Sequence, residues 1–476
     1  MTAVRYRPHR RAPSSAIRGA RVPLRRLTAA LLFLLATPLV AAPVPTVVVD
    51  IHARGANGVA ELKNDKGVRW SVELGDELLL GVDADALPAW LVRNGVRAGP
   101  AALAFEEIVL RDHVCTHVDH APAIATIGGY EIVRMDPIAA LATRGAAVDG
   151  EPPPADGVVA REVRNTDAPA RPMGSDPWVA AIVARIDANR WFDTMSALAA
   201  FNRNSFSPTL PNARDWLLAR FGEAGLAAQT FPFQMVAQGC TPTPPAIPLD
   251  NPVGVHVGTS LPDEWIVVGA HYDSRNSVRC DGTANPQPGA NDNGTGCAGV
   301  IELARAFQDI PTERTIVFMC FAGEEQGLVG SRRYVESLQA DATIARVKHM
   351  VNLDMIGHAI DADLDARVET TPAHAAVLSQ YTDAAATYAP ELNLITSTAA
   401  QANSDHWYFL AAGVPGAFTW ENGAGIYPHY HQSTDLPANL LRARELAGGI
   451  LKMDAAVIAG LAGAGEAPMF KDGFEG

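Results

Sequence analysis

The sequence has 476 residues, too many for one typical domain, and 48% of them are hydrophobic, enough to bury a sizeable core. Charged residues make up 19%, so the chain is not a disordered polyelectrolyte. The net charge of −14 argues against nucleic acid or an anionic membrane surface as a partner.

Residues 1–42 predict a secretory signal peptide. Residues 1–26 contain eight arginines and no acidic residue, and the apolar run 27–42 ends in small residues. The apolar core is shorter than the about 20 residues that a membrane span needs. We therefore expect a secreted or periplasmic protein with no membrane association after cleavage. Removing eight of the 38 basic residues leaves 30 against 52 acidic residues, a net charge of −22.

Residues 43–165 predict a small β-rich N-terminal module, or a propeptide, that ends in a proline-rich linker. Short apolar runs alternate with Gly and Asp, and strands are expected within 46–53, 69–74, 107–114 and 130–135. The linker is indicated by proline-rich stretches at 149–157 and 165–177. This region contains no cluster of residues that indicates chemistry.

Residues 166–465 predict one large α/β domain, followed by a mobile tail at 466–476. Apolar residues follow helical spacing in 177–186, 213–225, 296–310, 327–340 and 374–389. Strands are expected in 226–236, 264–274, 314–325, 348–358 and 413–420. Because strands alternate with helices and are almost continuously apolar, we expect a three-layer α/β/α sandwich.

Polar residues with metal-binding capacity follow several of these strands. They are His271, Asp273, Asp292, Glu324, Glu325, Asp354, His429, His431 and Asp435. Each signal is weak alone: an Asp before Asn-Gly-Thr-Gly is often a helix N-cap, and paired acids favour a solvated helix N-terminus. Ligands of open α/β sheets gather at the carboxyl ends of the strands, so together these residues predict one site.

The residue types suit zinc, cobalt or manganese, and several carboxylates this close would repel one another without a cation. If Asp292 bridges two metals, the first metal position would use His271, Asp292 and Asp354. The second position would use Asp292, Glu325 and His431. His429 is the alternative to His431, because residues two apart in an extended segment face the same way.

Two further acids have proposed catalytic roles. Glu324 would be the general base, which requires a turn that Gly323 and Gly327 permit. Asp273 would orient the His271 imidazole. Asp405 and His406 are not counted as ligands.

The five cysteines are Cys115, Cys240, Cys280, Cys297 and Cys320. Cys280 and Cys297 flank a loop and could close it with a disulfide, whereas Cys320 lies in an apolar strand and is expected to be a free thiol. No cysteine spacing indicates a metal site. The GxGxxG match at 294–299 follows a polar loop rather than a strand, so it indicates only the start of a helix.

Five stretches in this order resemble one known family: HYDS (271–274), GANDNGTG (289–296), FAGEEQGLVGS (321–331), NLDMIG (352–357) and YHQSTD (430–435). The series is similar to the secreted bacterial di-zinc aminopeptidases of the leucine-aminopeptidase type, in metallopeptidase family 28. The resemblance covers roughly 178–460. It implies a mixed sheet, two zinc ions per chain, a removable propeptide and the assignment of roles given above, including the choice of His431.

The resemblance implies a monomeric enzyme that removes residues from peptide or protein N-termini. Two other readings remain open: a single-zinc enzyme like glutaminyl-peptide cyclotransferase, and a non-catalytic binding module on the same fold. Carboxypeptidase or amino-sugar activity is also open, since a metal site alone does not choose the substrate. Tyr427, Trp420 and Phe418 are candidate walls of the first pocket, although they follow strand spacing and fit a core equally well.

Overall fold

The computed structural model describes residues 42–51, 54, 56–75, 77–94, 97–112, 123–127, 130–134, 157–160, 163–164, 176–236, 240, 244–359, 362–398, 400, 402–421 and 427–465. The predicted signal peptide, apart from its last residue, and the predicted tail lie outside this range, as does most of the proline-rich linker. Within it, the structure has no helix with both the length and the apolar character that crossing a bilayer requires.

The N-terminal part contains two antiparallel-rich sheets, and all four predicted strands are present there. The five-stranded sheet has the order β4-β1-β3-β2-β8, from β1 (Thr46–Asp50), β2 (Val68–Leu74), β3 (Glu77–Val82), β4 (Arg97–Ala98) and β8 (Val158–Ala160). The three-stranded sheet is β5 (Ile108–Asp112), β7 (Tyr130–Arg134) and β6 (Ala125–Ile127). The helices are α1 (Ala56–Lys63), α2 (Leu87–Asn94) and the short turn η1 (Phe105–Glu107).

Period-two alternation explains the two small cores of this part. In β1, Val47 and Val49 pack into one cluster with Trp90, whereas Val48 packs into another with Leu79. Successive side chains of a strand point to opposite faces, so both faces of the five-stranded sheet are covered.

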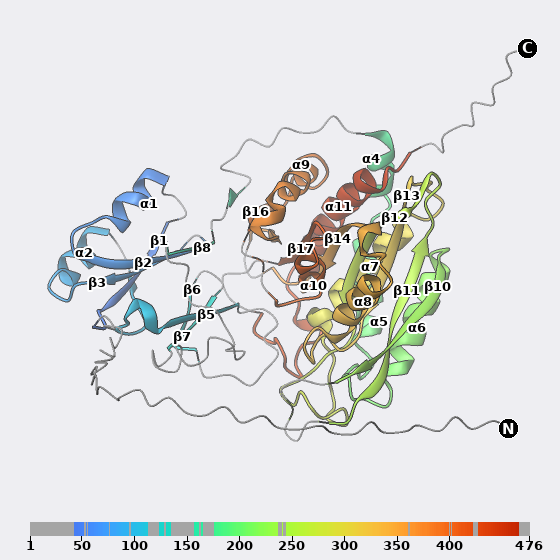
Figure 1. The fold of residues 1–476 in the computed structure, drawn as a ribbon, viewed down its shortest axis with the longest axis horizontal. Helices are drawn as coiled ribbons and strands as arrows, with labels where there is room; N and C mark the ends of the chain where they lie inside the picture. The colour runs from blue at the N-terminus through green and yellow to red at the C-terminus, as the bar shows by residue number, and fades with distance from the viewer. Residues whose placement is uncertain are drawn as a thin grey trace, which may run out of the picture. The chain divides into compact units, whose positions relative to one another are not determined.

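The larger part is built on a mixed nine-stranded sheet with the order β10-β11-β13-β12-β14-β17-β15-β16-β9 (Figure 1). The strands are β9 (Val163–Arg164), β10 (Ala227–Met235), β11 (Ile247–His256), β12 (Leu261–His271), β13 (Arg314–Phe321), β14 (Val347–Leu353), β15 (Asp365–Glu369), β16 (Asn393–Ser397) and β17 (Gly416–Glu421). The four strands β13, β12, β14 and β17 are parallel neighbours, and β10, β11 and β9 pair antiparallel.

Helices cover both faces of this sheet, which confirms the predicted three-layer sandwich. One face carries α4 (Pro177–Val183), α5 (Ala188–Leu198), α6 (Leu210–Glu223), α7 (Gly296–Ala306), α9 (Leu378–Tyr388) and α11 (Ala443–Ala462), and the other carries α8 (Val329–Ala340) and α10 (His406–Ala411). Short helical turns are η2 (Ala290–Thr295), η3 (Ile344–Arg346), η4 (Pro372–Val377) and η5 (Pro437–Asn439). Alternation sorts the sheet residues: Ile266 and Val268 face the first group, and Val267 faces the second.

The sequence left the disulfide pairing open, and the structure does not pair Cys280 with Cys297. Cys280 is bonded to Cys240, while Cys297 and Cys320 are buried free cysteines, as expected for Cys320. Cys297 lies in the first turn of α7, where its thiol contacts the backbone carbonyl of His271 at 3.1 Å. The thiol therefore faces the core under β12, away from the exposed loop that holds Cys280.

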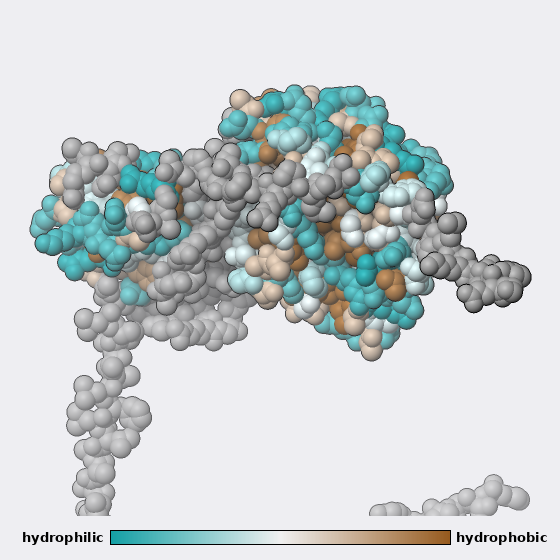
Figure 2. All heavy atoms as spheres, turned by 90° about the horizontal axis from the view of Figure 1, so that it is seen from above, coloured by the Kyte–Doolittle hydropathy of each residue, from teal (hydrophilic) through white to brown (hydrophobic). Residues whose placement is uncertain are grey.

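The described surface shows no single large hydrophobic patch in the view of Figure 2, unlike the sheet edge, where charged residues gather. Figure 2 shows one face, on which hydrophilic and hydrophobic residues are interspersed over the described part of the chain. Val257, Val278 and Leu441 are among the large hydrophobic side chains that are exposed. The carboxyl ends of the adjacent strands β13, β12 and β14 instead bring several buried charged residues together.

Candidate metal centre

His271 is the last residue of β12 and is completely buried. Its Nδ1 lies 3.0 Å from the backbone carbonyl of Asp273, which can only accept a hydrogen bond. Nδ1 therefore carries the proton in the neutral ring, and the lone pair of Nε2 faces the neighbouring carboxylates. The ring is held in the tautomer that a metal ligand needs.

Asp273 orients His271 mainly through its carbonyl, because its carboxylate lies 3.7 Å from Nδ1. That carboxylate accepts hydrogen bonds from Ser205 Oγ at 2.6 Å and from the backbone N–H groups of Glu324 and Glu325 at 3.1 and 3.3 Å. Burial raises the pKa of Asp273 to about 6. Asp273 thus joins the end of β12 to the turn after β13, a connection that the sequence did not indicate.

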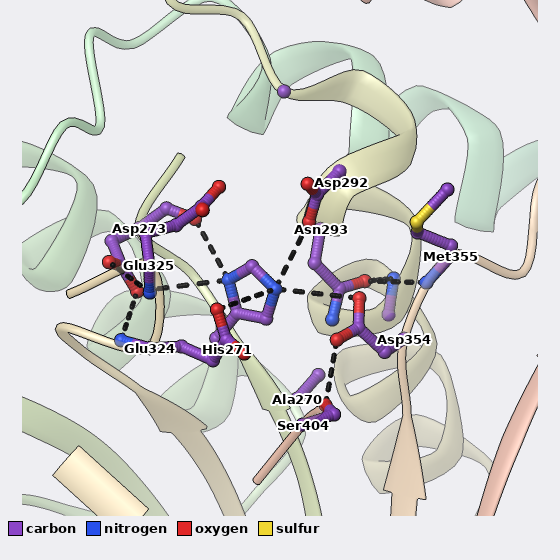
Figure 3. A network of polar contacts seen from close by, with 12 residues as sticks. Ala270, His271, Asp273, Asp292, Asn293, Glu324, Glu325, Asp354, Met355 and Ser404 are labelled. Atoms are coloured by element: carbon purple, nitrogen blue, oxygen red, sulfur yellow. Dashed lines mark hydrogen bonds and ion pairs between the residues drawn. The ribbon is translucent and has the colours of Figure 1, made fainter. Parts of the chain in front are cut away.

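The Glu324–Glu325 turn has the predicted geometry. Gly323 and Gly327 adopt φ of +70° and +108°, in the region that favours glycine. A Cβ at Gly323 would lie 3.0 Å from Met235 Sδ, so packing also restricts this position. The turn directs both buried acids of the pair toward the strand ends (Figure 3).

Asp292 is not the N-cap of the helix that follows it. Asn293 Oδ1 accepts the backbone N–H of Gly296 at 2.8 Å, which leaves the Asp292 carboxylate available. Its two oxygens face two different imidazoles, with Oδ1 at 3.2 Å from His271 Nε2 and Oδ2 at 3.0 Å from His431 Nε2. This is the arrangement expected of a bridging ligand.

Asp435 fixes the backbone of that loop. Its two carboxylate oxygens accept the N–H groups of Asn291 and Asp292, at 2.9 and 3.0 Å. Asp435 is 1% exposed, and burial raises its pKa to about 7. The sequence indicated Asp435 as part of the cluster but not this role.

Asp354 follows β14 directly, and its Oδ1 lies 3.4 Å from His271 Nε2. Its other oxygen accepts a hydrogen bond from Ser404 Oγ at 2.7 Å, and Ser404 Oγ accepts one from Asn352 Nδ2 at 2.8 Å. Ser404 stands beside Asp405 in a segment from which we assigned no ligand, so its contact with Asp354 was missed.

The structure brings His431, rather than His429, to the centre. His431 Nε2 lies 3.3 Å from Glu325 Oε2, and the Tyr430 ring stacks on the imidazole at 3.6 Å. His429 instead contacts Thr434 Oγ1 at 2.8 Å. The backbone of His431 has φ of +53°, so the two histidines do not share the extended conformation that made them equivalent in sequence.

All seven predicted site residues therefore lie together, in two groups with Asp292 between them. The first half-site has His271 and Asp354, with the predicted base Glu324 beside them and Asp273 behind His271, and the second has Glu325 and His431. The ligand atoms of His271, Glu324 and Asp354 lie within 4.8 Å of one another, as do those of Asp292, Glu325 and His431.

The pKa values of the clustered carboxylates and imidazoles are shifted by burial and by one another. Burial raises the pKa of Glu324 and of Asp354. Burial would lower the pKa of His271, but the facing carboxylates of Asp354 and Glu324 outweigh it and raise that pKa. Burial also opposes ionisation of Asp292, yet the imidazoles of His271 and His431 keep its pKa below the usual range.

The residues present fit a bound cation. Among the described residues, His271 Nε2, both Asp292 oxygens and Glu325 Oε1 are buried and lack a partner in hydrogen-bond geometry. Buried polar atoms are normally paired, and buried charges are paired or coordinate metals. Imidazole nitrogens and carboxylate oxygens are suitable zinc ligands.

A buried arginine, Arg203, hydrogen-bonds to the backbone of the loops that carry Asp273 and Asp292. Arg203 donates to the carbonyls of Tyr272, Pro288 and Gly289, each at 2.7 Å, and to that of Leu198 at 2.9 Å. It is completely buried, so these carbonyls satisfy a desolvated guanidinium. Arg203 thereby fixes the segments that precede Asp273 and Asp292. An arginine between predicted elements normally indicates solvated surface, so no sequence pattern indicates that Arg203 is buried.

The fold and the cluster together define an α/β/α domain with a candidate two-metal centre at its strand ends. Residues 251–447 match the model of peptidase family M28. This stretch of the large α/β domain is therefore similar to peptidase family M28.

Curated relatives match over part of their length. A probable zinc metalloprotease of Pyrenophora teres f. teres (strain 0-1) is 33% identical over 199 residues, 37% of this chain and 40% of the relative. Aminopeptidase YwaD of Bacillus subtilis (strain 168) is 31% identical over 200 residues, 41% of each chain. This chain thus spans well under two thirds of the length of these relatives.

Solved structures with the same fold include two aminopeptidases. LapA of Legionella pneumophila aligns with a TM-score of 0.50 and 19% identity, covering 88% of this chain and 99% of that chain. The enzyme from Aneurinibacillus sp. strain AM-1 aligns with a TM-score of 0.50 and 18% identity, covering 61% and 97%. These similarities agree with the α/β/α fold described above.

Proposed function

We propose that this chain is an exported zinc aminopeptidase that hydrolyses N-terminal residues from peptides with two zinc ions. The observation that carries the proposal is the position of Asp292, whose two oxygens face the imidazoles of the two half-sites at 3.2 and 3.0 Å. Export rests on the signal-peptide pattern of residues 1–42. The relatives named as zinc metalloprotease and aminopeptidase support the metal and the reaction class.

His271 and Asp354 would hold the first zinc, Glu325 and His431 the second, and Asp292 both. Zinc at these ligands would lower the pKa of an attacking water toward neutrality and polarise the peptide carbonyl. Proton transfer is assigned to a side chain of the protein. The Glu324 carboxylate takes the proton of the attacking water and returns it to the leaving amine, which is general base and then general acid catalysis.

Asp273 acts on Glu324 through the backbone. By accepting the N–H groups of Glu324 and Glu325, it sets the direction of the base relative to the ligand beside it. Burial raises the pKa of Glu324, so its carboxylate binds a proton more readily than a solvent-exposed glutamate does.

The test is Glu324→Gln, assayed on aminoacyl nitroanilides with and without chelator. Turnover should fall by about 10²–10⁴-fold because the amide cannot take the proton. Zinc content should stay unchanged, since Glu324 is not a proposed ligand. Glu336→Gln, on the exposed side of α8, is the matched control and should keep full turnover. Wild-type turnover in Glu324→Gln would show that another group is the base.

A further inference from the structure

Arg275 contacts both ligands that belong only to the second half-site. It follows β12 by four residues, and its side chain is 12% exposed. Its Nε lies 3.0 Å from Glu325 Oε2, and its Nη2 contacts His431 Nδ1. One guanidinium therefore touches the carboxylate and the imidazole that would hold the second metal.

The charge of Arg275 competes with a metal ion. A carboxylate oxygen that is already in an ion pair with a guanidinium attracts a second cation less strongly, because part of its charge is compensated. A fixed positive charge at this distance also repels a dication, and burial makes that repulsion stronger than it would be in water. Glu325 Oε2 therefore binds a metal more weakly while Arg275 is in contact with it.

Arg275 also selects the tautomer of His431. A guanidinium has only donors, so the contacted Nδ1 accepts, and the proton of the neutral ring is on Nε2. That atom faces Asp292 Oδ2 at 3.0 Å and Glu325 Oε2 at 3.3 Å. Ligation through Nε2 needs its lone pair, so the proton must move to Nδ1 and Arg275 must leave.

His271 provides the internal contrast. Its Nδ1 already donates to the Asp273 carbonyl at 3.0 Å, so the neutral ring has its lone pair on Nε2 and needs no change of tautomer. The first half-site is thus arranged for a metal, while the second is arranged around a guanidinium.

We propose that Arg275 makes the second half-site the weaker metal position and is displaced when that position fills. This inference rests on the proposed two-metal function. It assigns Arg275 as a positioning residue that regulates metal occupancy, and it predicts that the two positions fill at separate metal concentrations.

The experiment titrates metal-depleted full-length protein with Co²⁺, followed by calorimetry and visible absorption. Wild type should bind two equivalents in two resolved steps. Arg275→Met should tighten the second step and leave the first unchanged. The expected gain is about 10–100-fold, equal in size and opposite in sign to the loss that follows removal of a supporting outer partner. Lysine keeps the positive charge but lacks the planar guanidinium that contacts two groups at once. The second-step affinity of Arg275→Lys should therefore lie between those of wild type and Arg275→Met.

Arg190→Met is the matched control. Arg190 pairs with the buried Glu302 at 2.6 and 2.9 Å in a similar way, without contacting a proposed ligand. The Arg190→Met substitution should lower the unfolding temperature and leave both Co²⁺ binding steps in place. This separates the loss of a buried ion pair from the release of metal ligands.

Two results would overturn the inference. If two equivalents bind but Arg275→Met leaves the second step unchanged or weaker, Arg275 does not oppose the metal, and the proposed function survives. If neither protein binds a second equivalent, the two-metal proposal fails and this inference fails with it.

Discussion

The two half-sites of the candidate centre share Asp292 but are built differently. His271 and Asp354 directly end or follow the adjacent strands β12 and β14 and are fully buried. Glu325 lies in a glycine-bounded turn, and His431 lies in an irregular segment with φ of +53° and is 9% exposed. The first half-site is set by the sheet and by backbone and hydroxyl contacts, whereas the second depends on loops and contacts Arg275.

Ligand identity alone does not make two metal positions equivalent. His271 and His431 present the same atom, Nε2, to Asp292. What distinguishes them is the partner of Nδ1, a carbonyl for His271 and a guanidinium for His431. Outer partners of this kind fix the tautomer and basicity of a ligating imidazole.

The largest expected effect comes from removing one histidine at a time. His271→Ala should lose the tighter metal equivalent, whereas His431→Ala should keep it and lose only the weaker one, as measured by metal content after dialysis. Turnover should fall in both by more than the about 10–100-fold typical of outer partners. His429→Ala is the control and should keep both equivalents. Loss of metal in His429→Ala alone would show that the second ligand is assigned to the wrong histidine.

A smaller effect is expected from Asp435→Asn. An amide has one accepting oxygen, so its NH₂ group would face one of the two N–H groups that Asp435 now accepts. Because Asp292 serves both half-sites, both metal affinities should weaken by about 10–100-fold in a Co²⁺ titration. A loss confined to one step would mean that Asp292 is not shared.

The last substitution concerns stability rather than metal and is expected to leave metal binding unchanged. Asp454 on α11 is fully buried, accepts a hydrogen bond from Thr419 at 3.3 Å, and has a pKa raised by burial from 3.8 to about 8. Between these values the folded chain binds more protons than the unfolded chain at this group, so its contribution to stability falls as pH rises from about 4 to 8.

Asp454→Asn should remove that loss. Relative to wild type, the variant should gain stability with rising pH by at most about 1.4 kcal/mol per pH unit, measured by denaturant unfolding of metal-depleted protein at pH 5 and pH 8. The pH 5 comparison is the internal control, because most of the predicted gain is absent there. Equal differences at the two pH values would contradict the buried, protonated state of Asp454.

The sequence was enough to predict the layers and to group the candidate ligands at one edge of the sheet, because both follow from local pattern. The choice of His431 over His429 also used the family resemblance. Apolar strands end in polar residues at one edge of the sheet, which identified the first half-site. Strands β15 and β16, each five residues long, gave little signal. Strand β11 contains Pro248 and Pro252, which argue against a strand, and it was also missed.

The missing parts required three-dimensional contacts. Helix α11 contains Gly448 and Gly449, which weaken a helix prediction, yet a Cβ at Gly449 would lie 2.7 Å from Leu392 Cδ2. The roles of Arg203 and Arg275 depend on loops that fold over them, and the disulfide partner of Cys280 lies 40 residues away. None of these pairings follows from spacing.

The most direct test of the central claim is anomalous diffraction at the zinc edge from crystals of the wild-type protein equilibrated with zinc. Two anomalous peaks about 3.5–4 Å apart are expected, with Asp292 between them. One peak should contact His271 and Asp354, and the other Glu325 and His431. A single peak at saturating zinc, or two peaks that do not share Asp292, would contradict the account.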